Sequence, residues 1–212
     1  MEIDSIRLIR SKKNKFANKA GKQKCKYIFG VGASEGGYGS LLKIIPFLHP
    51  ELPIAFIIII HAESRYVDAF ARYLDANSLF NVKRAADGDT VEAGVCYIAA
   101  GEEHVSVDSG MGSYALRVNK SELPKHKGSI NLLMYSLAQA LKERSIGVVL
   151  TGSGNDGTDG VHAISTVGGA VIVQKPESCL CREMSISVIA QCNVNMVIAD
   201  NKLADKLNRS FL

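Results

Sequence analysis

The sequence has no apolar run that approaches the roughly 18–20 residues needed to span a bilayer. Its most apolar run, at residues 54–60, holds only seven residues. The amino terminus also has no apolar segment of the kind found in secretory signals. These absences exclude a protein with membrane-spanning helices, and we expect a cytoplasmic protein without membrane insertion.

Metal-binding and disulfide patterns are also missing. The five cysteines form no Cys-x-x-Cys pair, and Cys179 and Cys181 lie too close together for the usual zinc spacing. The five histidines show no helical pairing and no neighbouring carboxylate cluster. We therefore expect reduced thiols and no metal site.

Proline is scarce, at 5 of 212 residues, while 47% of the residues are hydrophobic. This composition excludes disordered and collagen-like chains and fits one globular domain. The net charge of +4 is uneven, because residues 1–27 carry nine bases and two acids, whereas residues 28–212 carry 16 bases and 19 acids. We expect a poorly ordered basic arm at residues 1–26 and one domain at 27–212. No P-loop or basic stripe with aromatic residues predicts nucleic-acid binding.

Apolar runs and helical periodicity alternate along the domain. Buried strands are predicted at 26–33, 54–60, 146–151, 170–174 and 194–198. Helices are predicted at 36–48, 65–78, 129–144, 158–167 and 182–191, with a short helix at the end of the chain. Repeated strand–helix units predict an α/β fold with a doubly wound, mostly parallel sheet and helices on both faces.

Four short strands between Gly and Asp turns interrupt this rhythm, at residues 82–85, 95–99, 105–107 and 114–118. They predict an inserted antiparallel hairpin region beside the parallel sheet.

Three polar residues follow the carboxyl ends of three predicted strands: Ser34, His61 and Asp156. Ligands bind at this edge of a parallel sheet, so the three side chains are expected to converge. A hydroxyl, an imidazole and a carboxylate are the groups of a serine nucleophile with its base and orienting acid. Ser34 also lies in a Gly-x-Ser-x-Gly stretch at 32–36, which is the spacing of a nucleophile elbow.

Each of these residues also has an ordinary structural interpretation, as a turn residue or a strand cap. Gly30 and Gly32 further permit a dinucleotide-binding interpretation, although the third glycine of that fingerprint falls on Glu35 and an acid is missing after the second strand. The residues alone leave these alternatives open.

Several segments resemble the catalytic domain of the CheB chemotaxis protein-glutamate methylesterases. They are IFGVGASEGG at 28–37, Ile60–His61, ADGD at 86–89, residues 94–101 with His104, and LTGSGNDG at 150–157. The resemblance runs in order over residues 27–200. It implies a triad of Ser34, His61 and Asp156, with backbone amides near His61 and Ser153 as oxyanion-hole candidates.

The resemblance further implies a serine hydrolase that demethylates glutamyl methyl esters on the cytoplasmic helices of chemoreceptors. Deamidation of receptor glutamines is a second implied activity, and no cofactor is required. The chain departs from the family at four places near the site. Glu35 replaces a usual Thr and Ser153 replaces a usual Met. A usual Gly-Met-Pro segment appears as Glu183-Met184-Ser185, and a usual Arg-Pro-Ser stretch appears as Lys127-Gly128-Ser129. The amino-terminal receiver domain of the family is not expected here. The alternative is a receptor-binding or scaffold module that keeps the fold and has lost turnover.

Overall fold

The computed structural model describes residues 25–110, 112–120 and 128–212. The predicted basic arm therefore lies outside the described residues, apart from its last two positions. No helix within the described ranges is both long and apolar enough to cross a membrane.

Seven strands form one sheet in the order β3-β4-β2-β1-β7-β8-β9, and all of their pairings are parallel. They are β1 (Tyr27–Ala33), β2 (Ile54–Ile60), β3 (Asn81–Arg84), β4 (Val95–Ala100), β7 (Ser145–Val149), β8 (Ala170–Gln174) and β9 (Met196–Ile198). A separate antiparallel hairpin consists of β5 (Glu103–Ser109) and β6 (Tyr114–Lys120). This is the predicted α/β class. The chain reverses its direction of winding at β1, whose two neighbours are β2 and β7.

The strand β2 shows why the sheet is covered on both faces. All seven of its residues are buried, and they alternate between two hydrophobic clusters. Ile54, Phe56, Ile58 and Ile60 belong to one cluster, and Ala55, Ile57 and Ile59 belong to the other. A continuous apolar run fits a parallel strand that is packed on both sides.

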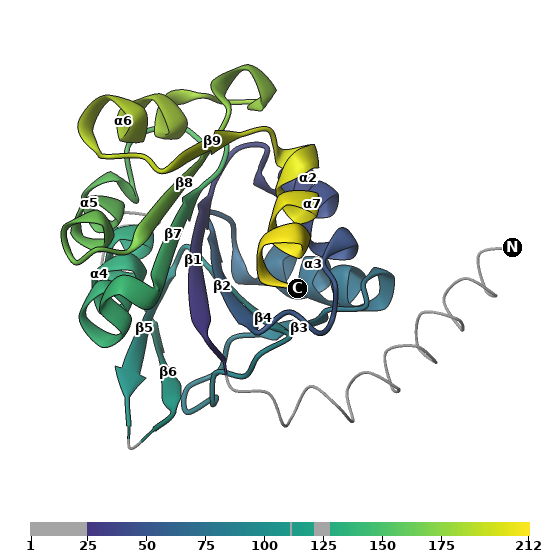
Figure 1. Cartoon of the computed structure of the whole chain (residues 1–212). Helices are drawn as coiled ribbons and strands as arrows, with labels where there is room; N and C mark the ends of the chain where they lie inside the picture. The colour runs from purple at the N-terminus through teal and green to yellow at the C-terminus, as the bar shows by residue number, and fades with distance from the viewer. Residues whose placement is uncertain (1–24, 111, 121–127) are drawn as a thin grey trace, which may run out of the picture.

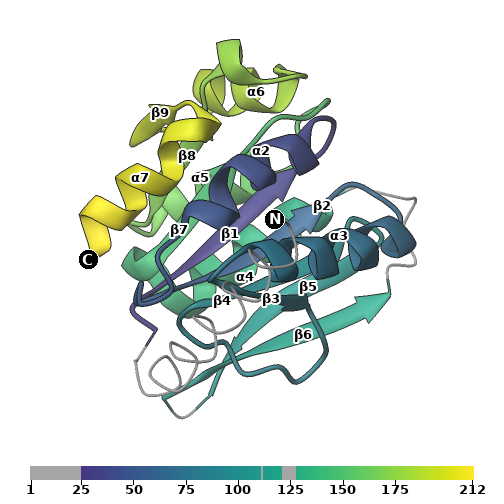
Figure 2. The ribbon, with the colours of Figure 1, turned by 90° about the vertical axis from the view of Figure 1, so that its right-hand side faces the viewer.

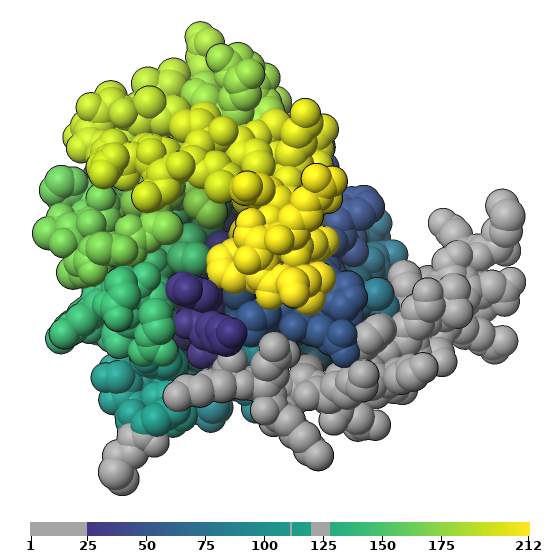
Figure 3. All heavy atoms as spheres, viewed as in Figure 1, coloured from purple at the N-terminus to yellow at the C-terminus, as the bar shows by residue number. Residues whose placement is uncertain are grey.

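Helices cover each face of the sheet (Figures 1 and 2). One face carries α2 (Gly37–Ile44), α3 (Ser64–Asn77) and α7 (Asp200–Phe211), and Figure 2 looks onto this face. The other face carries α4 (Ser129–Leu141), α5 (Thr158–Thr166), α6 (Glu183–Gln191) and the β5–β6 hairpin. With all atoms drawn, the yellow atoms of α7 lie beside the purple atoms at the start of β1 (Figure 3), where the rings of Tyr27 and Phe211 pack edge to face.

The predicted antiparallel region is smaller than expected. The strands predicted at 82–85 and 95–99 became β3 and β4, which pair parallel to each other, and β4 also pairs parallel to β2. Both faces of β4 are buried, so it extends the main sheet. Within the described residues, antiparallel pairing is limited to the β5–β6 ladder and one isolated bridge between Thr90 and Ala115. The Gly and Asp turns indicated hairpins, in which neighbouring strands run antiparallel. Turn residues do not determine the direction in which the chain re-enters the sheet, and here β4 runs parallel to β3.

The helix predicted at 36–48 also ends early. α2 stops at Ile44 and a 3-10 turn, η1, spans Ile45–Phe47, where Pro46 lacks the N–H that an α-helix would use. Two further 3-10 turns, η2 (Lys142–Arg144) and η3 (Pro176–Ser178), follow α4 and β8.

Two glycines of β1 allow α4 to lie close to the sheet. A Cβ atom on Gly30 would stand 2.4 Å from Leu137 Cδ1, and one on Gly32 would stand 2.4 Å from Ile130 Cγ2. Real Cβ atoms do not approach other atoms this closely. The pair that permitted a dinucleotide-binding interpretation therefore serves helix packing, which brings the first turn of α4 to the sheet edge.

Replacing Gly32 by Ala should destabilise the fold by about 1–3 kcal/mol, because the new methyl group overpacks a buried contact. Urea unfolding measures this loss. Gly39→Ala is the matched control, since no atom lies within 4 Å of the place that its methyl group would take in helix α2, and it should raise stability by about 0.5–1 kcal/mol. Equal effects of the two changes would contradict the close approach of α4.

Candidate active site

The parallel register brings the three predicted residues to one edge of the sheet. Ala33 pairs with Ile60, so Ser34 and His61 leave the ends of β1 and β2 at the same level. On the other side of β1, the Ser34 N–H donates to the Thr151 carbonyl at 3.0 Å, which aligns the loop that follows β7. The convergence expected from sequence is therefore a consequence of strand register.

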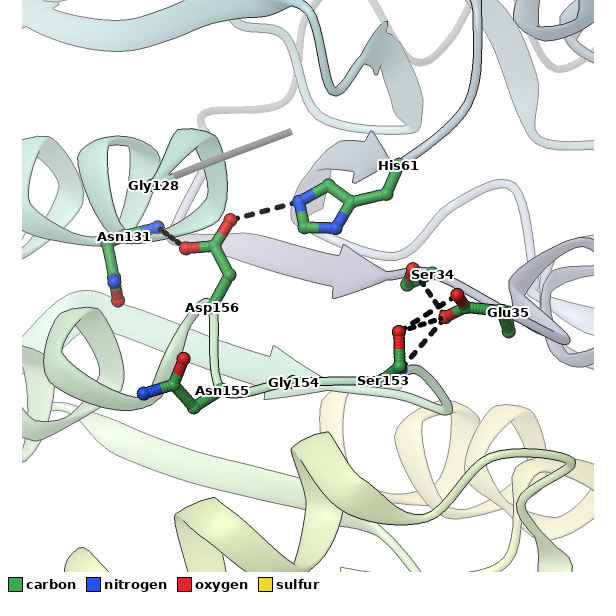
Figure 4. A pocket seen from close by; sticks show the side chains of 9 residues that line it. All are labelled: Ser34, Glu35, His61, Gly128, Asn131, Ser153, Gly154, Asn155 and Asp156. Atoms are coloured by element: carbon green, nitrogen blue, oxygen red, sulfur yellow. Dashed lines mark hydrogen bonds and ion pairs between the residues drawn. The ribbon is translucent and has the colours of Figure 1, made fainter. Parts of the chain in front are cut away.

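Ser34, His61 and Asp156 line one cavity of about 630 Å³ (Figure 4). The other lining residues are Glu35, Gly128, Asn131, Ser153, Gly154 and Asn155. In the close-up the imidazole lies between Asp156 and Ser34. Within the described ranges, no three His, Cys, Asp or Glu side chains gather as metal ligands.

The carboxylate of Asp156 fixes the imidazole of His61. The Nε2 and Oδ2 atoms are 2.9 Å apart, and the two side chains are only 9% and 12% exposed. The hydroxyl of Ser129 lies 3.4 Å from the same nitrogen, a longer contact. Since Nε2 is directed at Asp156, Nδ1 is the nitrogen that would accept a proton from a nucleophile.

Asp156 is itself held by the first turn of α4. Its Oδ2 accepts the N–H of Ile130 and its Oδ1 accepts the N–H of Asn131, each at 3.1 Å. The residue before α4, Gly128, has no side chain to cap these amides. Asp156 therefore caps a helix that is distant in sequence, and the helix in return sets the position of the carboxylate.

Asn131 reciprocates this cap on the neighbouring helix α5. Its Oδ1 accepts the N–H groups of Gly157 and Gly160, at 3.1 and 2.7 Å. Asp156, just before α5, thus caps α4, and Asn131, in α4, caps α5. The two side chains hold the amino termini of the two helices together. Asn131 was not identified from the sequence, because its partners are backbone amides that carry no sequence signal.

The turn that presents Ser34 depends on a glycine in the left-handed region. Gly36 has φ of 84° at the start of α2, and a Cβ atom there would stand 2.6 Å from Leu180 Cβ. Gly152 is equally restricted, since its Cβ would lie 2.6 Å from the Ser34 Cβ. These two positions keep the loops after β1 and β7 close together beside the nucleophile candidate.

The hydroxyl of Ser34 donates to Glu35 Oε2 at 2.8 Å. The same carboxylate accepts the Ser153 N–H at 2.9 Å and the Ser153 hydroxyl at 2.8 Å. Two of the positions that depart from the family pattern therefore meet in one interaction, which we call the Glu35–Ser153 clamp. The sequence marked each residue as a departure, but nothing in it indicates that the two side chains touch.

The clamp keeps Glu35 ionised. Its pKa is lowered from 4.5 to about 2, first by the Ser153 N–H and then by the Ser34 hydroxyl, against a small opposing effect of burial. A lowered pKa means that the ionised form stabilises the fold above pH 4.5, and that this contribution is lost as the pH falls toward about 2.

The two amides named as oxyanion-hole candidates have different partners. The Ser153 N–H reaches the Glu35 carboxylate at the cavity, whereas the His61 N–H donates to the Ala33 carbonyl at 2.9 Å. The Ser153 amide is therefore the one that faces an anion in this structure.

A sequence model of the family described as CheB methylesterase matches residues 29–207. The chain belongs to the CheB methylesterase family.

Curated relatives and a solved structure extend the match. Protein-glutamate methylesterase/protein-glutamine glutaminases from Methanosarcina mazei and Pyrococcus horikoshii are each 32% identical, over 93% and 97% of this chain. The crystal structure of the Thermotoga maritima CheB methylesterase catalytic domain superimposes with a TM-score of 0.82 at 31% identity. It covers 87% of this chain and 98% of that domain.

The match to the two curated relatives covers 54% and 55% of their length. The chain thus spans about half the length of these proteins, and it corresponds to the catalytic domain of the solved structure.

Asn131→Ala should lower the free energy of unfolding by about 1–2 kcal/mol, because two amides at the start of α5 lose their acceptor. Urea unfolding is the measurement. Gln139→Ala, at an exposed position of the same helix, should stay within about 0.5 kcal/mol of the parent protein. An unchanged free energy of unfolding in Asn131→Ala would show that the cap does not contribute to stability.

The side-chain carboxyl of Glu35 should remain ionised at about pH 3.5, where an ordinary glutamate is mostly protonated. Carbon-13 NMR of the carboxyl resonance follows this titration. Ser34→Ala should raise the pKa of Glu35, because one hydrogen-bond donor is lost. A midpoint near 4.5 in the parent protein would contradict the clamp.

Proposed function

We propose that the chain is a serine hydrolase that demethylates glutamyl methyl esters on chemoreceptors. The observation that carries the proposal is the fixed His61–Asp156 pair beside Ser34 in one cavity. Membership of the CheB methylesterase family and the similarity to protein-glutamate methylesterase/protein-glutamine glutaminases support the substrate class. The glutaminase activity of these relatives supports deamidation of receptor glutamines as the second activity.

In the proposed reaction, Ser34 Oγ attacks the ester carbonyl and its proton passes to His61. The carbon–oxygen bond to the methoxy group then breaks, and His61 returns the proton so that methanol leaves. His61 then takes a proton from a water molecule, which attacks the carbonyl carbon of the acyl-enzyme. The bond between that carbon and Ser34 Oγ breaks, His61 returns the proton to Ser34 Oγ, and the glutamate leaves. Asp156 stabilises the imidazolium through Nε2, and the Ser153 N–H stabilises the developing oxyanion.

The proposed partners are the cytoplasmic helices of methyl-accepting chemotaxis receptors, which places the reaction in the cytoplasm. The basic arm at residues 1–26 is a candidate docking segment for acidic receptor helices, because it carries nine bases and two acids while the rest of the chain has more acids than bases.

A second candidate function is a receptor-binding module without turnover. It is favoured by the hydrogen bond from Ser34 to Glu35, since this proton is not directed at the base. Binding of receptor fragments without ester or amide hydrolysis would decide for this candidate.

Methanol release from methylated receptor fragments tests the proposal. Ser34→Ala should abolish release, and Asp156→Asn should reduce it on the order of 10³–10⁴-fold, because the imidazolium loses its counter-charge. Asn can still accept one α4 amide, so the Asp156→Asn protein should lose far more activity than stability. Release by Ser34→Ala at the parent rate would reject the serine mechanism.

A further inference from the structure

The Glu35 carboxylate occupies the hydrogen-bond donors that a reacting ester would need. It accepts the Ser153 N–H at 2.9 Å, the Ser153 hydroxyl at 2.8 Å and the Ser34 hydroxyl at 2.8 Å. A carbonyl oxygen that becomes negative during attack requires donors of this kind at the same place. The carboxylate thus stands where the substrate's oxygen would bind.

The clamp also controls the proton of Ser34. A hydroxyl group has a single proton, and here that proton is directed at Glu35 Oε2. It has to turn toward His61 before His61 can act as a base. The clamp therefore holds Ser34 in a resting orientation.

A second carboxylate, that of Glu183, accepts the N–H of the residue after Ser153. Gly154 N–H donates to Glu183 Oε2 at 2.8 Å. Two consecutive amides of the loop after β7 are thus already paired with acids of the same chain. The loop is an anion-binding element whose donors are occupied at rest.

We propose that Glu35 is a gating residue that occupies the carbonyl subsite and restrains Ser34 until a substrate displaces it. This inference rests on the proposed function only in taking Ser34 as the nucleophile. Protonation does not open the gate at neutral pH, because the pKa of Glu35 is lowered to about 2 by its donors. The displacing group is therefore the substrate carbonyl itself.

Labelling of Ser34 by a fluorophosphonate measures the restraint without a receptor. Ser34 Oγ attacks phosphorus, the phosphorus–fluorine bond breaks, fluoride leaves and the hydroxyl proton passes to His61. Glu35→Ala should label at least tenfold faster than the parent protein, since the donors and the Ser34 proton are released. Ser153→Ala, which keeps the amide and removes the hydroxyl, should show a smaller increase.

Glu177→Ala is the matched control. It removes one acid from an exposed site beside Lys175, away from the cavity, so it changes the net charge equally and should label at the parent rate. Because Glu35 is exposed, its replacement should not disturb the core. Thermal melting verifies that each variant protein is folded.

Inhibition of labelling by acetate distinguishes gating by Glu35 from a general structural effect of the Glu35→Ala change. The donors vacated in Glu35→Ala should bind this carboxylate, so millimolar acetate should slow labelling of that variant. The parent protein should be insensitive, because its own carboxylate already fills the site.

Equal or slower labelling of Glu35→Ala, or equal acetate sensitivity of the two proteins, would overturn the gate. Faster, acetate-sensitive labelling would support it even if no variant released methanol from receptors, in which case the proposed function alone would fail. Methanol release with equal labelling would reject the gate and keep the proposed function. Failure to label either protein would reject both.

Discussion

The position of Asp156 is the constraint on which the site depends. One carboxylate accepts two amides of α4 and also holds the imidazole of His61. The first amides of a helix have no partner within the helix, so the carboxylate and the helix terminus satisfy each other. The orientation of the imidazole is thereby tied to the packing of a helix against the sheet.

The packing of α4 depends in turn on glycines, which leave room for close contact because they have no side chain. Gly30 and Gly32 have no side chains to hold α4 away from β1, and Gly160 allows α4 and α5 to approach, since its Cβ would lie 2.5 Å from Met134 Cβ. The reciprocal cap by Asn131 then fixes α5 relative to α4. The geometry of the site therefore depends on close helix packing, which small residues permit.

The sequence predicted the features that follow from local patterns. The run at 54–60 predicted a buried parallel strand, and parallel strands predicted that Ser34, His61 and Asp156 would meet at one edge. It did not predict that β3 and β4 pair parallel, because turn residues such as Gly88 and Gly94 mark a change of direction without fixing where the chain returns. Nor did it reveal Asn131 or the contact between Glu35 and Ser153, since both depend on distances between segments that are far apart in the sequence.

Two of the departures from the family pattern, Glu35 and Ser153, act as a coupled pair because their side chains bind each other. A carboxylate at position 35 beside an apolar residue at 153 would keep the amide but lose the hydroxyl donor, and a serine at 153 without Glu35 would have no acceptor there. Together they satisfy each other, and they do so on the donors of the candidate active site. The pair leaves Ser34, His61 and Asp156 in place and changes what the site holds at rest. Loss of turnover is therefore not required by Glu35, because a bound carboxylate can be displaced by a carbonyl group that develops charge in the same position.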